Sequence, residues 1–343
     1  MKALVYTKPF RFEYTDVPDP VIGKQDVLIR VKACGICGSD VRGYMGKTGR
    51  RIPPLIMGHE AAGTVEDVGR HVKNVSRGDR VCFDSTVYCN HCESCRQRDY
   101  NRCERRQVLG VSTSDFKRNG AFAEYLSVPW WIVSKIPDHM AFTQAALLEP
   151  VSIGLHAANR TPISSHQTGV VIGAGTIGLC IIQAAKQKGV ERIIVSDINE
   201  FRLGLARELG AHVVVNPSQS NVKETVLKET NGKGADVTFE AAGLAETFQQ
   251  AVKVTRTGGH ITVVGLSEKG INLDVQQVVS REITLRGSYA SAGEFQDCVD
   301  LVSEGKINVE PFISRVLPLS HGQRAFDLLH KGEEDLVKIV LEP

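Results

Sequence analysis

The sequence predicts an α/β protein with a mainly β first domain and a doubly wound parallel sheet in the second. Residues 1–150 contain short apolar alternations such as 27–32 and 61–68, separated by turn residues, as in the closely spaced strands of a barrel or sandwich. From residue 151 to about 289, strands alternate with helical segments, which is typical of a parallel sheet. A length of 343 residues also suits two domains better than one.

The composition is that of an ordinary globular protein, with 42% hydrophobic and 23% charged residues. A formal net charge of +2 argues against nucleic acid or an anionic membrane as a partner. Residues 169–185 are uncharged, but they are fewer than the roughly 20 needed to span a bilayer and include four glycines. The first residues lack the pattern of a secretory signal, so we expect the cytoplasm, with the nine cysteines as ligands and free thiols.

The first domain contains a stretch with the ligand types of a catalytic zinc site. It begins with Cys37-Gly-Ser39-Asp40 and ends with Gly58-His59-Glu60. Zinc takes sulfur, nitrogen and oxygen ligands at tetrahedral geometry, and three protein ligands leave a fourth position open for water or substrate. A single Cys or His is usually an ordinary core or surface residue. The ordered combination is more specific, and it predicts the reactive centre at Cys37, His59 and Glu60.

A second metal site is predicted from four closely spaced cysteines, Cys89, Cys92, Cys95 and Cys103. Four thiolates within fifteen residues form a closed set that suits structural zinc. An iron–sulfur site is the nearest alternative, but the fourth cysteine is followed by glutamate rather than proline. The arginines around this lobe are interpreted as a solvated or interface surface, because no recognition helix with a second ligand pair accompanies them.

A helix is predicted to begin near residue 148, with Pro150 in its first turn. Glu149 lies at the same place, next to apolar residues at the domain junction. As a carboxylate in a first turn it could interact with the helix dipole. It could equally be a ligand of a metal or of a metal-bound water, and the residues alone favour neither role.

The second domain carries a dinucleotide-binding fingerprint. Gly173-x-Gly175-x-x-Gly178 follows a β-branched strand and opens a helix, and Asp197 ends the next strand about twenty residues later. The glycines let a pyrophosphate approach the helix N-terminus. Asp197 would accept hydrogen bonds from ribose hydroxyls and repel a 2′-phosphate, so NAD is favoured over NADP. The predicted cofactor-binding residues are Gly173, Gly175, Thr176, Ile177, Gly178, Asp197, Arg202, Val264 and Leu266.

The remaining elements of the second domain complete a predicted six-stranded sheet. His260 is placed at a strand start, where a surface role is favoured over a catalytic one. The helix 320–330 and the strand 337–341 are expected to return to the first domain. The predicted elements are a strand 192–197, a helix 201–209, a strand 213–215, a buried strand and turn over 236–243, and strands 259–265 and 282–287.

These motifs together resemble the zinc-dependent medium-chain dehydrogenases, and within them the sorbitol (polyol) and galactitol-phosphate dehydrogenase branch, over essentially the full chain. The resemblance implies a GroES-like catalytic domain, residues 1–150 completed by about 290–343, and a Rossmann NAD-binding domain, residues 151–289, with the active site between them. It implies one catalytic zinc at Cys37 and His59, with Glu60 or Glu149 completing the shell, and one structural zinc at the four-cysteine lobe.

The resemblance also implies a mechanism, in which zinc lowers the pKa of a substrate hydroxyl and a hydride passes to the nicotinamide. Ser39 matches the hydroxyl that begins the proton relay. Two departures bear on the substrate. Arg42 occupies a position where relatives often carry histidine, and Tyr289 is followed by Ala290 rather than by the substrate-contacting arginine of sorbitol dehydrogenases. An insertion at residues 114–119, with Lys117 and Arg118, is a further candidate for lining the pocket.

The expected function is oxidation of a secondary alcohol of a polyol, sugar or sugar derivative to a ketone, with NAD as acceptor. One alternative is an amino-alcohol oxidation such as that of threonine, against which Glu149 speaks because threonine dehydrogenases tend to carry aspartate there. The other is a non-enzymatic zinc-binding protein, which the intact Cys37, Ser39, His59 and Glu60 disfavour. By resemblance a homo-oligomer is expected, either a dimer or a tetramer.

Overall fold

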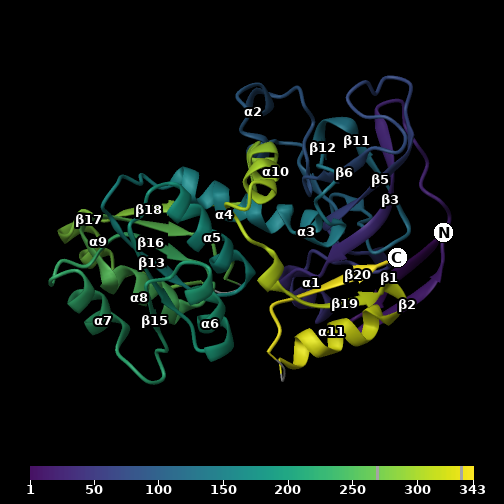
Figure 1. Ribbon diagram of the computed structural model, residues 1–343. Coiled ribbons are helices and arrows are strands. Elements are labelled where there is room, and N and C mark those ends of the chain that lie inside the picture. The colour runs from purple at the N-terminus through teal and green to yellow at the C-terminus, as the bar shows by residue number, and fades with distance from the viewer. Residues whose placement is uncertain (268–269, 333–334) are drawn as a thin grey trace. The chain divides into compact units, whose positions relative to one another are not determined.

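The computed structural model describes residues 1–267, 270–332 and 335–343 (Figure 1). The chain forms two compact units. Unit 1 consists of residues 1–149, 291–304 and 309–343, and unit 2 of residues 150–290 and 305–308. The C-terminal segment thus belongs to the same unit as the N-terminal half of the chain.

Unit 1 is built on a mainly antiparallel sheet with the strand order β12-β6-β5-β3-β20-β19, and β11 also pairs with β3. The C-terminal strand β20 pairs with the end of β3, so that Val340 lies opposite Gly35 and Leu341 opposite Cys34. The last residues of the chain therefore complete the sheet beside the first zinc-ligand motif. The strands are β3 Asp26–Gly35, β5 Glu60–Val68, β6 Arg80–Phe83, β11 Tyr125–Pro129, β12 Val133–Lys135, β19 Ile313–Pro318 and β20 Lys338–Glu342.

Smaller sheets and short helices surround this sheet. The small sheets consist of β1 Lys2–Lys8, β2 Arg11–Asp16 and β4 Leu55–Ile56; of β7 Thr86–Val87 and β8 Gln107–Val108; and of β9 Val111–Ser112 and β10 Lys117–Arg118. The helices are α1 Gly38–Tyr44, α2 Glu93–Arg96, α3 Phe142–Ala146, α10 Phe295–Ser303 and α11 Gly322–Lys331, with 3₁₀ turns η1 Tyr100–Arg102, η2 Trp130–Ile132, η3 Glu310–Phe312 and η4 Leu319–His321.

An aromatic cluster joins α11 to the N-terminal strands of unit 1. The ring of Phe326 lies 4.5 Å from that of Phe12 and 5.3 Å from that of Tyr44. The Tyr44 hydroxyl donates a hydrogen bond to Asp327 at 2.6 Å. Burial of each such ring stabilises the fold by about 1.5–3 kcal/mol. The cluster therefore anchors the C-terminal helix that precedes β20.

Unit 2 contains a six-stranded parallel sheet with the order β15-β14-β13-β16-β17-β18. This order runs outward in both directions from β13, which confirms the predicted doubly wound sheet, and such sheets bind ligands at the strand ends where the order reverses. The elements are α4 Leu148–Arg160, whose first two residues belong to unit 1, β13 Thr168–Ile172, α5 Thr176–Gln187, β14 Arg192–Ser196, α6 Glu200–Glu208, β15 Val213–Val215, α7 Val222–Glu229, β16 Ala235–Glu240, α8 Ala245–Val254, β17 Thr255–Val263, α9 Val275–Ser280 and β18 Thr284–Gly287.

One local prediction in this sheet is wrong. His260 lies inside β17, opposite Thr284 of β18, rather than at a strand start. The strand is irregular at Gly258 and Gly259: its register with β16 shifts between Thr255 and His260, and Gly258 takes a φ of 68°, a conformation that glycine adopts without strain. Within the described part of the chain, no helix is both long and apolar enough to cross a bilayer, and the uncharged segment 169–185 forms β13 and most of α5.

Candidate active site

The thiol of Cys37 is placed by the start of α1. Cys37 is the N-cap of this helix, and its sulfur accepts a hydrogen bond from the backbone N–H of Ser39 at 3.5 Å. In return, Asp40 accepts one from the backbone N–H of Cys37 at 3.4 Å. The sequence Cys-Gly-Ser-Asp thus produces a capped helix that holds the sulfur of Cys37 at its N-terminus.

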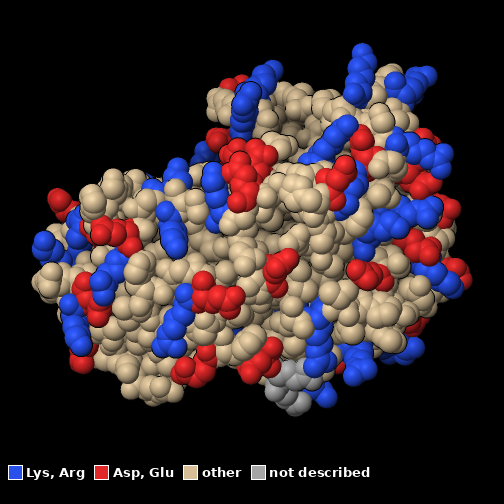
Figure 2. All heavy atoms as spheres, viewed as in Figure 1, with Lys and Arg blue, Asp and Glu red and all other residues tan. Residues whose placement is uncertain are grey.

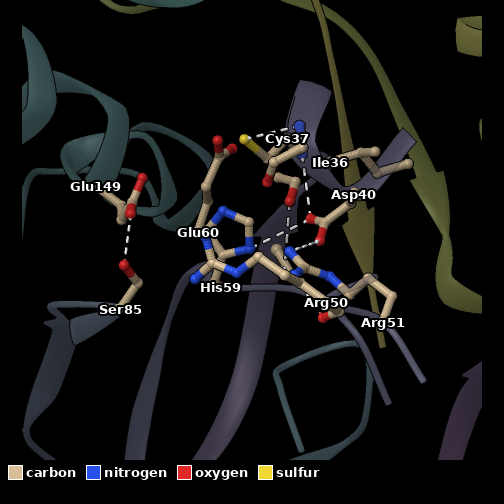
Figure 3. Close-up of polar contacts among 12 residues, drawn as sticks. Ile36, Cys37, Asp40, Arg50, Arg51, His59, Glu60, Ser85 and Glu149 are labelled. Atoms are coloured by element: carbon tan, nitrogen blue, oxygen red, sulfur yellow. Dashed lines mark hydrogen bonds and ion pairs between the residues drawn. The ribbon is translucent and has the colours of Figure 1, made fainter. Parts of the chain in front are cut away.

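Cys37, His59 and Glu60 come together as one cluster. One ligand atom from each residue lies within 4.8 Å of those of the other two, and His59 and Glu60 are buried (Figure 3). Glu60 begins β5 and lies opposite Gly35 of β3. A Cβ at position 35 would lie 2.5 Å from a carboxylate oxygen of Glu60, so glycine makes room for that side chain. The sulfur, nitrogen and oxygen donors fit a zinc ion with a position left open.

Asp40 contacts the Nδ1 side of the imidazole of His59. Its Oδ2 lies 3.4 Å from Nδ1 of His59, and its Oδ1 accepts a hydrogen bond from Nη2 of Arg51 at 3.1 Å (Figure 3). Burial alone would raise the pKa of Asp40, but His59 and Arg51 outweigh burial and lower the pKa to about 2. The charges of Asp40 and Cys37 likewise raise the pKa of His59 above its usual value despite burial. A ligating imidazole must be neutral, so a metal ion and a proton would compete for His59.

Lys338 forms a buried ion pair with Glu60. Nζ of Lys338 lies 2.9 and 2.7 Å from the two carboxylate oxygens, and it also donates to the backbone carbonyl of Ile36 at 3.0 Å. Both side chains are 1% exposed. Burial lowers the pKa of Lys338, but the attraction of Glu60 and Cys37 raises it above its usual value overall. Sequence reasoning missed this residue, and its only signal is a lysine at the start of an apolar strand.

Glu149 is not a member of the three-residue cluster. Its carboxylate accepts a hydrogen bond from the hydroxyl of Ser85 at 2.6 Å, and Figure 3 shows it directed toward that side chain. Burial, with a smaller contribution from Glu60, raises the pKa of Glu149 to about 7, although His59 acts in the opposite direction. The carboxylate of Glu149 thus interacts electrostatically with His59 and Glu60, although it does not belong to the cluster of ligand atoms.

Asp84, next to Ser85, ties the segment after Tyr289 into unit 1. Its Oδ2 accepts a hydrogen bond from the hydroxyl of Ser291 at 2.9 Å, and its Oδ1 accepts one from the backbone N–H of Thr86 at 2.8 Å. Burial raises the pKa of Asp84 to about 6 despite these hydrogen bonds. Ser291 thus has a definite structural role at the position after Ala290, where the sequence departs from the sorbitol dehydrogenase pattern.

The raised pKa of Asp84 predicts a pH-dependent loss of stability. Its pKa is about 3.9 when unfolded, so its stabilising contribution is complete below pH 4 and is lost as the pH rises through about 6. A shift of about 2 units corresponds to about 3 kcal/mol. Asp84→Asn can keep both hydrogen bonds without a charge, so we expect its free energy of unfolding, relative to wild type, to rise by up to about 3 kcal/mol between pH 4 and pH 8.

Urea unfolding of Asp84→Asn and wild type at several pH values measures the difference between their free energies of unfolding. The two proteins share all other titrating groups, so the contributions of those groups cancel. Asp115→Asn, on the exposed hairpin at residues 111–118, is the matched control. A difference between Asp84→Asn and wild type that does not change with pH would contradict the prediction.

The four cysteines of the second motif also converge. Their ligand atoms lie within 4.8 Å of one another. Backbone N–H groups support the sulfurs, since that of Cys89 donates to Cys103 at 3.3 Å and that of Cys92 donates to Cys89 at 3.4 Å. Cys92 and Cys95 lie at the start and within the short helix α2. This closed set of four thiolates fits a structural zinc ion.

The glycine-rich loop of unit 2 has the geometry of a phosphate-binding turn. Gly173 takes a φ of 98°, and a Cβ at Gly178 would lie 1.8 Å from the carbonyl oxygen of Gly173. Gly175 caps α5 without a side-chain hydrogen bond, so the amides of the first turn, which includes Thr176 and Ile177, can bind an anion. The loop follows β13, at the point where the strand order reverses.

Asp197 follows β14 and contacts this loop. Its carboxylate accepts hydrogen bonds from the backbone N–H groups of Ala174 at 2.6 Å and Asn199 at 2.9 Å. Arg202 lies in the first turn of α6, which Asn199 caps. Val264 donates from its backbone to Glu240, and Leu266 is 52% exposed beyond the end of β17. Each predicted cofactor residue therefore follows or flanks the carboxyl end of a strand in unit 2.

Four other predicted residues lie in the described part of unit 1. Ser39 is half-buried in the first turn of α1, and Arg42 is half-buried in its last turn. The insertion at residues 114–119 contributes β10, which pairs with β9; there Lys117 is exposed and Arg118 donates a hydrogen bond to Gln107. Figure 2 shows acidic and basic side chains interspersed over the visible face, in keeping with the net charge of +2.

Comparison with known families identifies the class of protein. Residues 23–138 match the alcohol dehydrogenase GroES-like domain, and residues 176–304 match the zinc-binding dehydrogenase family. A sorbitol dehydrogenase of Bacillus subtilis is 33% identical over 100% of this chain and 97% of its own length. An L-threonine 3-dehydrogenase of Symbiobacterium thermophilum is 34% identical over 96% of this chain and 93% of its own length. A D-arabitol-phosphate dehydrogenase of Enterococcus avium is 31% identical over 96% of this chain and 93% of its own length.

Comparison with solved structures leads to the same class of protein. An Escherichia coli oxidoreductase/dehydrogenase of unknown specificity has a TM-score of 0.94 at 32% identity, covering 99% of this chain and 98% of its own. A putative zinc-binding dehydrogenase of Sinorhizobium meliloti, bound to NADP, has a TM-score of 0.92 at 29% identity and covers 100% and 99%.

The chain belongs to the zinc-dependent medium-chain alcohol dehydrogenase family, in its polyol dehydrogenase branch. This confirms the predicted GroES-like and Rossmann folds. It also confirms the prediction of a dehydrogenase that uses zinc and a nicotinamide dinucleotide, and it removes the non-enzymatic alternative.

Proposed function

We propose that this enzyme oxidises a secondary alcohol of a polyol, sugar or sugar derivative to the ketone, with NAD as hydride acceptor. The observation that carries the proposal is the convergence of Cys37, His59 and Glu60, which brings thiolate, imidazole and carboxylate donors within 4.8 Å of one another. The identity of the chain to polyol and sugar-alcohol dehydrogenases supports the substrate class.

Cys37 and His59 are proposed as the ligands of a catalytic zinc ion. When bound, zinc acts as a Lewis acid that lowers the pKa of an alcohol hydroxyl. Asp40 fixes the orientation of the imidazole through Nδ1, which leaves Nε2 for the metal. Glu60 is the better placed of the two candidate carboxylates, because Glu149 lies outside the cluster and is held by Ser85. A zinc ion bound through Glu60 would share that carboxylate with Nζ of Lys338, which contacts both of its oxygens.

Ser39 is proposed to take the proton that leaves the substrate hydroxyl. It lies two residues after Cys37 in the first turn of α1 and is half-buried. Arg42 lies one turn later on the same helix, and a guanidinium group is a poor proton relay. The proton is therefore proposed to leave Ser39 by another route, and Arg42 is available to bind an anionic group of the substrate or cofactor.

NAD is proposed as the preferred dinucleotide. The carboxylate of Asp197 is fixed beside the glycine-rich loop by the N–H groups of Ala174 and Asn199. A fixed negative charge at this place accepts hydrogen bonds from ribose hydroxyls and repels a 2′-phosphate. We also propose a homo-oligomer, dimeric or tetrameric, in the cytoplasm, and the resemblance to the dehydrogenase family supports both points.

Threonine oxidation is the second candidate function, because the L-threonine 3-dehydrogenase is as similar to this chain as the sorbitol dehydrogenase is. The glutamate at position 149, in place of the aspartate that threonine dehydrogenases tend to carry, favours the polyol proposal.

A substrate panel tests the proposal. Purified enzyme is mixed with NAD or NADP and with free polyols, sugar phosphates, sugar acids or threonine, and reduced nicotinamide is followed by its absorbance. We expect turnover with at least one of the first three classes and a higher kcat/KM with NAD. Turnover of threonine alone would contradict the substrate class. A preference for phosphorylated or acidic substrates, lost in Arg42→Leu, would assign the anion contact to Arg42.

The four-cysteine lobe is predicted to be structural. Cys95→Ser should lower the melting temperature or impair assembly while the folded fraction keeps its activity, because it removes part of the binding energy of a structural zinc, which is about 10–16 kcal/mol in small zinc domains. Thermal unfolding and activity per folded chain measure the two effects, and Cys92→Ser should behave alike. A variant that is fully stable but inactive would reverse the assignment.

A further inference from the structure

A buried arginine, Arg51, contacts Asp40, and Asp40 in turn contacts His59 of the predicted metal site. The side chain of Arg51 is 6% exposed. Its Nη2 donates to Oδ1 of Asp40 at 3.1 Å, and its Nη1 donates to the backbone carbonyl of Arg50 at 3.1 Å. Among the described residues its Nε has no hydrogen-bond partner. Burying a guanidinium with one nitrogen unpaired is unfavourable. A function of this side chain is therefore expected in its contact with Asp40.

Both the backbone and the side-chain stem of Arg51 are fixed by contacts with neighbouring segments. Its backbone forms a bridge to Ser112, whose N–H donates to Arg50 and whose carbonyl accepts from Ile52. Its aliphatic stem packs against α1 at Gly43, where a Cβ would lie 2.4 Å from Cγ of Arg51. Gly43 is one turn after Asp40 on the same helix, so the missing side chain at Gly43 lets the guanidinium reach Asp40.

Asp40 connects Arg51 to the metal cluster. The carboxylate is fully buried, with one oxygen bonded to Arg51 and the other facing Nδ1 of His59 at 3.4 Å. Without Arg51, the contact with His59 and the N–H of Cys37 would be all that orients this carboxylate among the contacts described here. A carboxylate behind a ligating histidine sets the tautomer and the orientation of the ring, and its loss typically weakens metal binding.

We propose that Arg51 is a positioning residue of the metal centre, which fixes the carboxylate of Asp40 and, through Asp40, the imidazole of His59. This inference rests on the proposed function, since it takes Cys37 and His59 as zinc ligands. The side-chain hydrogen bonds of Arg51 among the described residues go to Asp40 and to the carbonyl of Arg50, so its expected effect is on the affinity and geometry of the metal site.

The test measures metal affinity directly, with the four-cysteine lobe as an internal control in the same chain. Wild type, Arg51→Met, Arg51→Lys, Asp40→Asn and Asp40→Asn/Arg51→Met are stripped of zinc and titrated against a competing chelator. Cobalt(II) then reports the geometry of each site by its visible spectrum. We expect Arg51→Met to weaken the cysteine–histidine site by about 10–100-fold and to leave the lobe unchanged. Arg51→Lys should lose less, because lysine keeps the charge without the planar fork.

The double variant separates positioning from general stabilisation. If Arg51 acts through Asp40, Arg51→Met should add little to the loss already caused by Asp40→Asn. An equal further loss in that background would overturn the proposal, as would an unchanged affinity and cobalt spectrum in Arg51→Met together with a lower melting temperature. If Arg51→Met does not fold, Arg51→Lys decides, since no loss at its cysteine–histidine site would also overturn the proposal. A wild-type chain that binds zinc only at the lobe would instead refute the proposed function.

Discussion

Replacing Cys37 by serine is expected to reduce turnover by at least about 10³-fold while the fold and NAD binding are kept. A serine hydroxyl is a poor zinc ligand at neutral pH, so the metal and its several kcal/mol of transition-state stabilisation are lost, and each 1.36 kcal/mol is a factor of ten in rate. The thiol itself contributes little to packing, since Cys37 is only half-buried as the N-cap of α1, and serine is a good N-cap.

Three measurements on Cys37→Ser check the parts of this expectation separately. Steady-state kinetics gives the loss of turnover, metal analysis should fall from two zinc ions per chain to one, and fluorescence of bound reduced nicotinamide should show unchanged dinucleotide affinity. Cys34→Ala is the matched control, because this buried thiol lies three residues away but outside the ligand cluster. An active Cys37→Ser variant would remove Cys37 from the site.

The residues that could be predicted from sequence are those whose function requires a local pattern. The four cysteines fall within fifteen residues, and the glycine-rich loop within six, so spacing alone restricts how they can fold. The doubly wound sheet was equally predictable, because each strand and helix of a parallel sheet carries its own apolar run and turn signal. His260 was misplaced because two glycines usually end a strand, whereas here β17 runs through them.

The partners of the ligands could not be predicted, because they come from distant parts of the chain. Lys338 reaches Glu60 only because β20 pairs with the end of β3, and Arg51 reaches Asp40 only because Gly43 leaves space for it. Neither residue belongs to a motif. The same holds for Glu149, whose two possible roles were equal in the sequence and whose contact with Ser85 depends on how unit 1 folds. The sequence therefore predicts the candidate ligands, and the structure is needed to find the charged side chains that contact them.

Lys338→Met is expected to be strongly destabilising, although it leaves the proposed zinc ligands intact. It leaves Glu60 as an unpaired charge at 1% exposure and removes a donor from the carbonyl of Ile36. Breaking a buried ion pair in this way costs about 3–5 kcal/mol. Denaturant unfolding of the metal-free protein measures the loss. Glu60→Gln/Lys338→Met, which removes both charges, should recover most of it, and Lys331→Met, at the exposed end of α11, should have little effect.

Zinc should act differently on this variant and on wild type. In wild type Lys338 and the metal compete for the carboxylate of Glu60, whereas in Lys338→Met the carboxylate has only the metal as a cationic partner. Binding to the folded state stabilises it by mass action, so zinc should raise the melting temperature of Lys338→Met more than that of wild type. Equal increases in the two proteins would show that Glu60 does not approach the metal, and the third protein ligand would then have to be sought at Glu149.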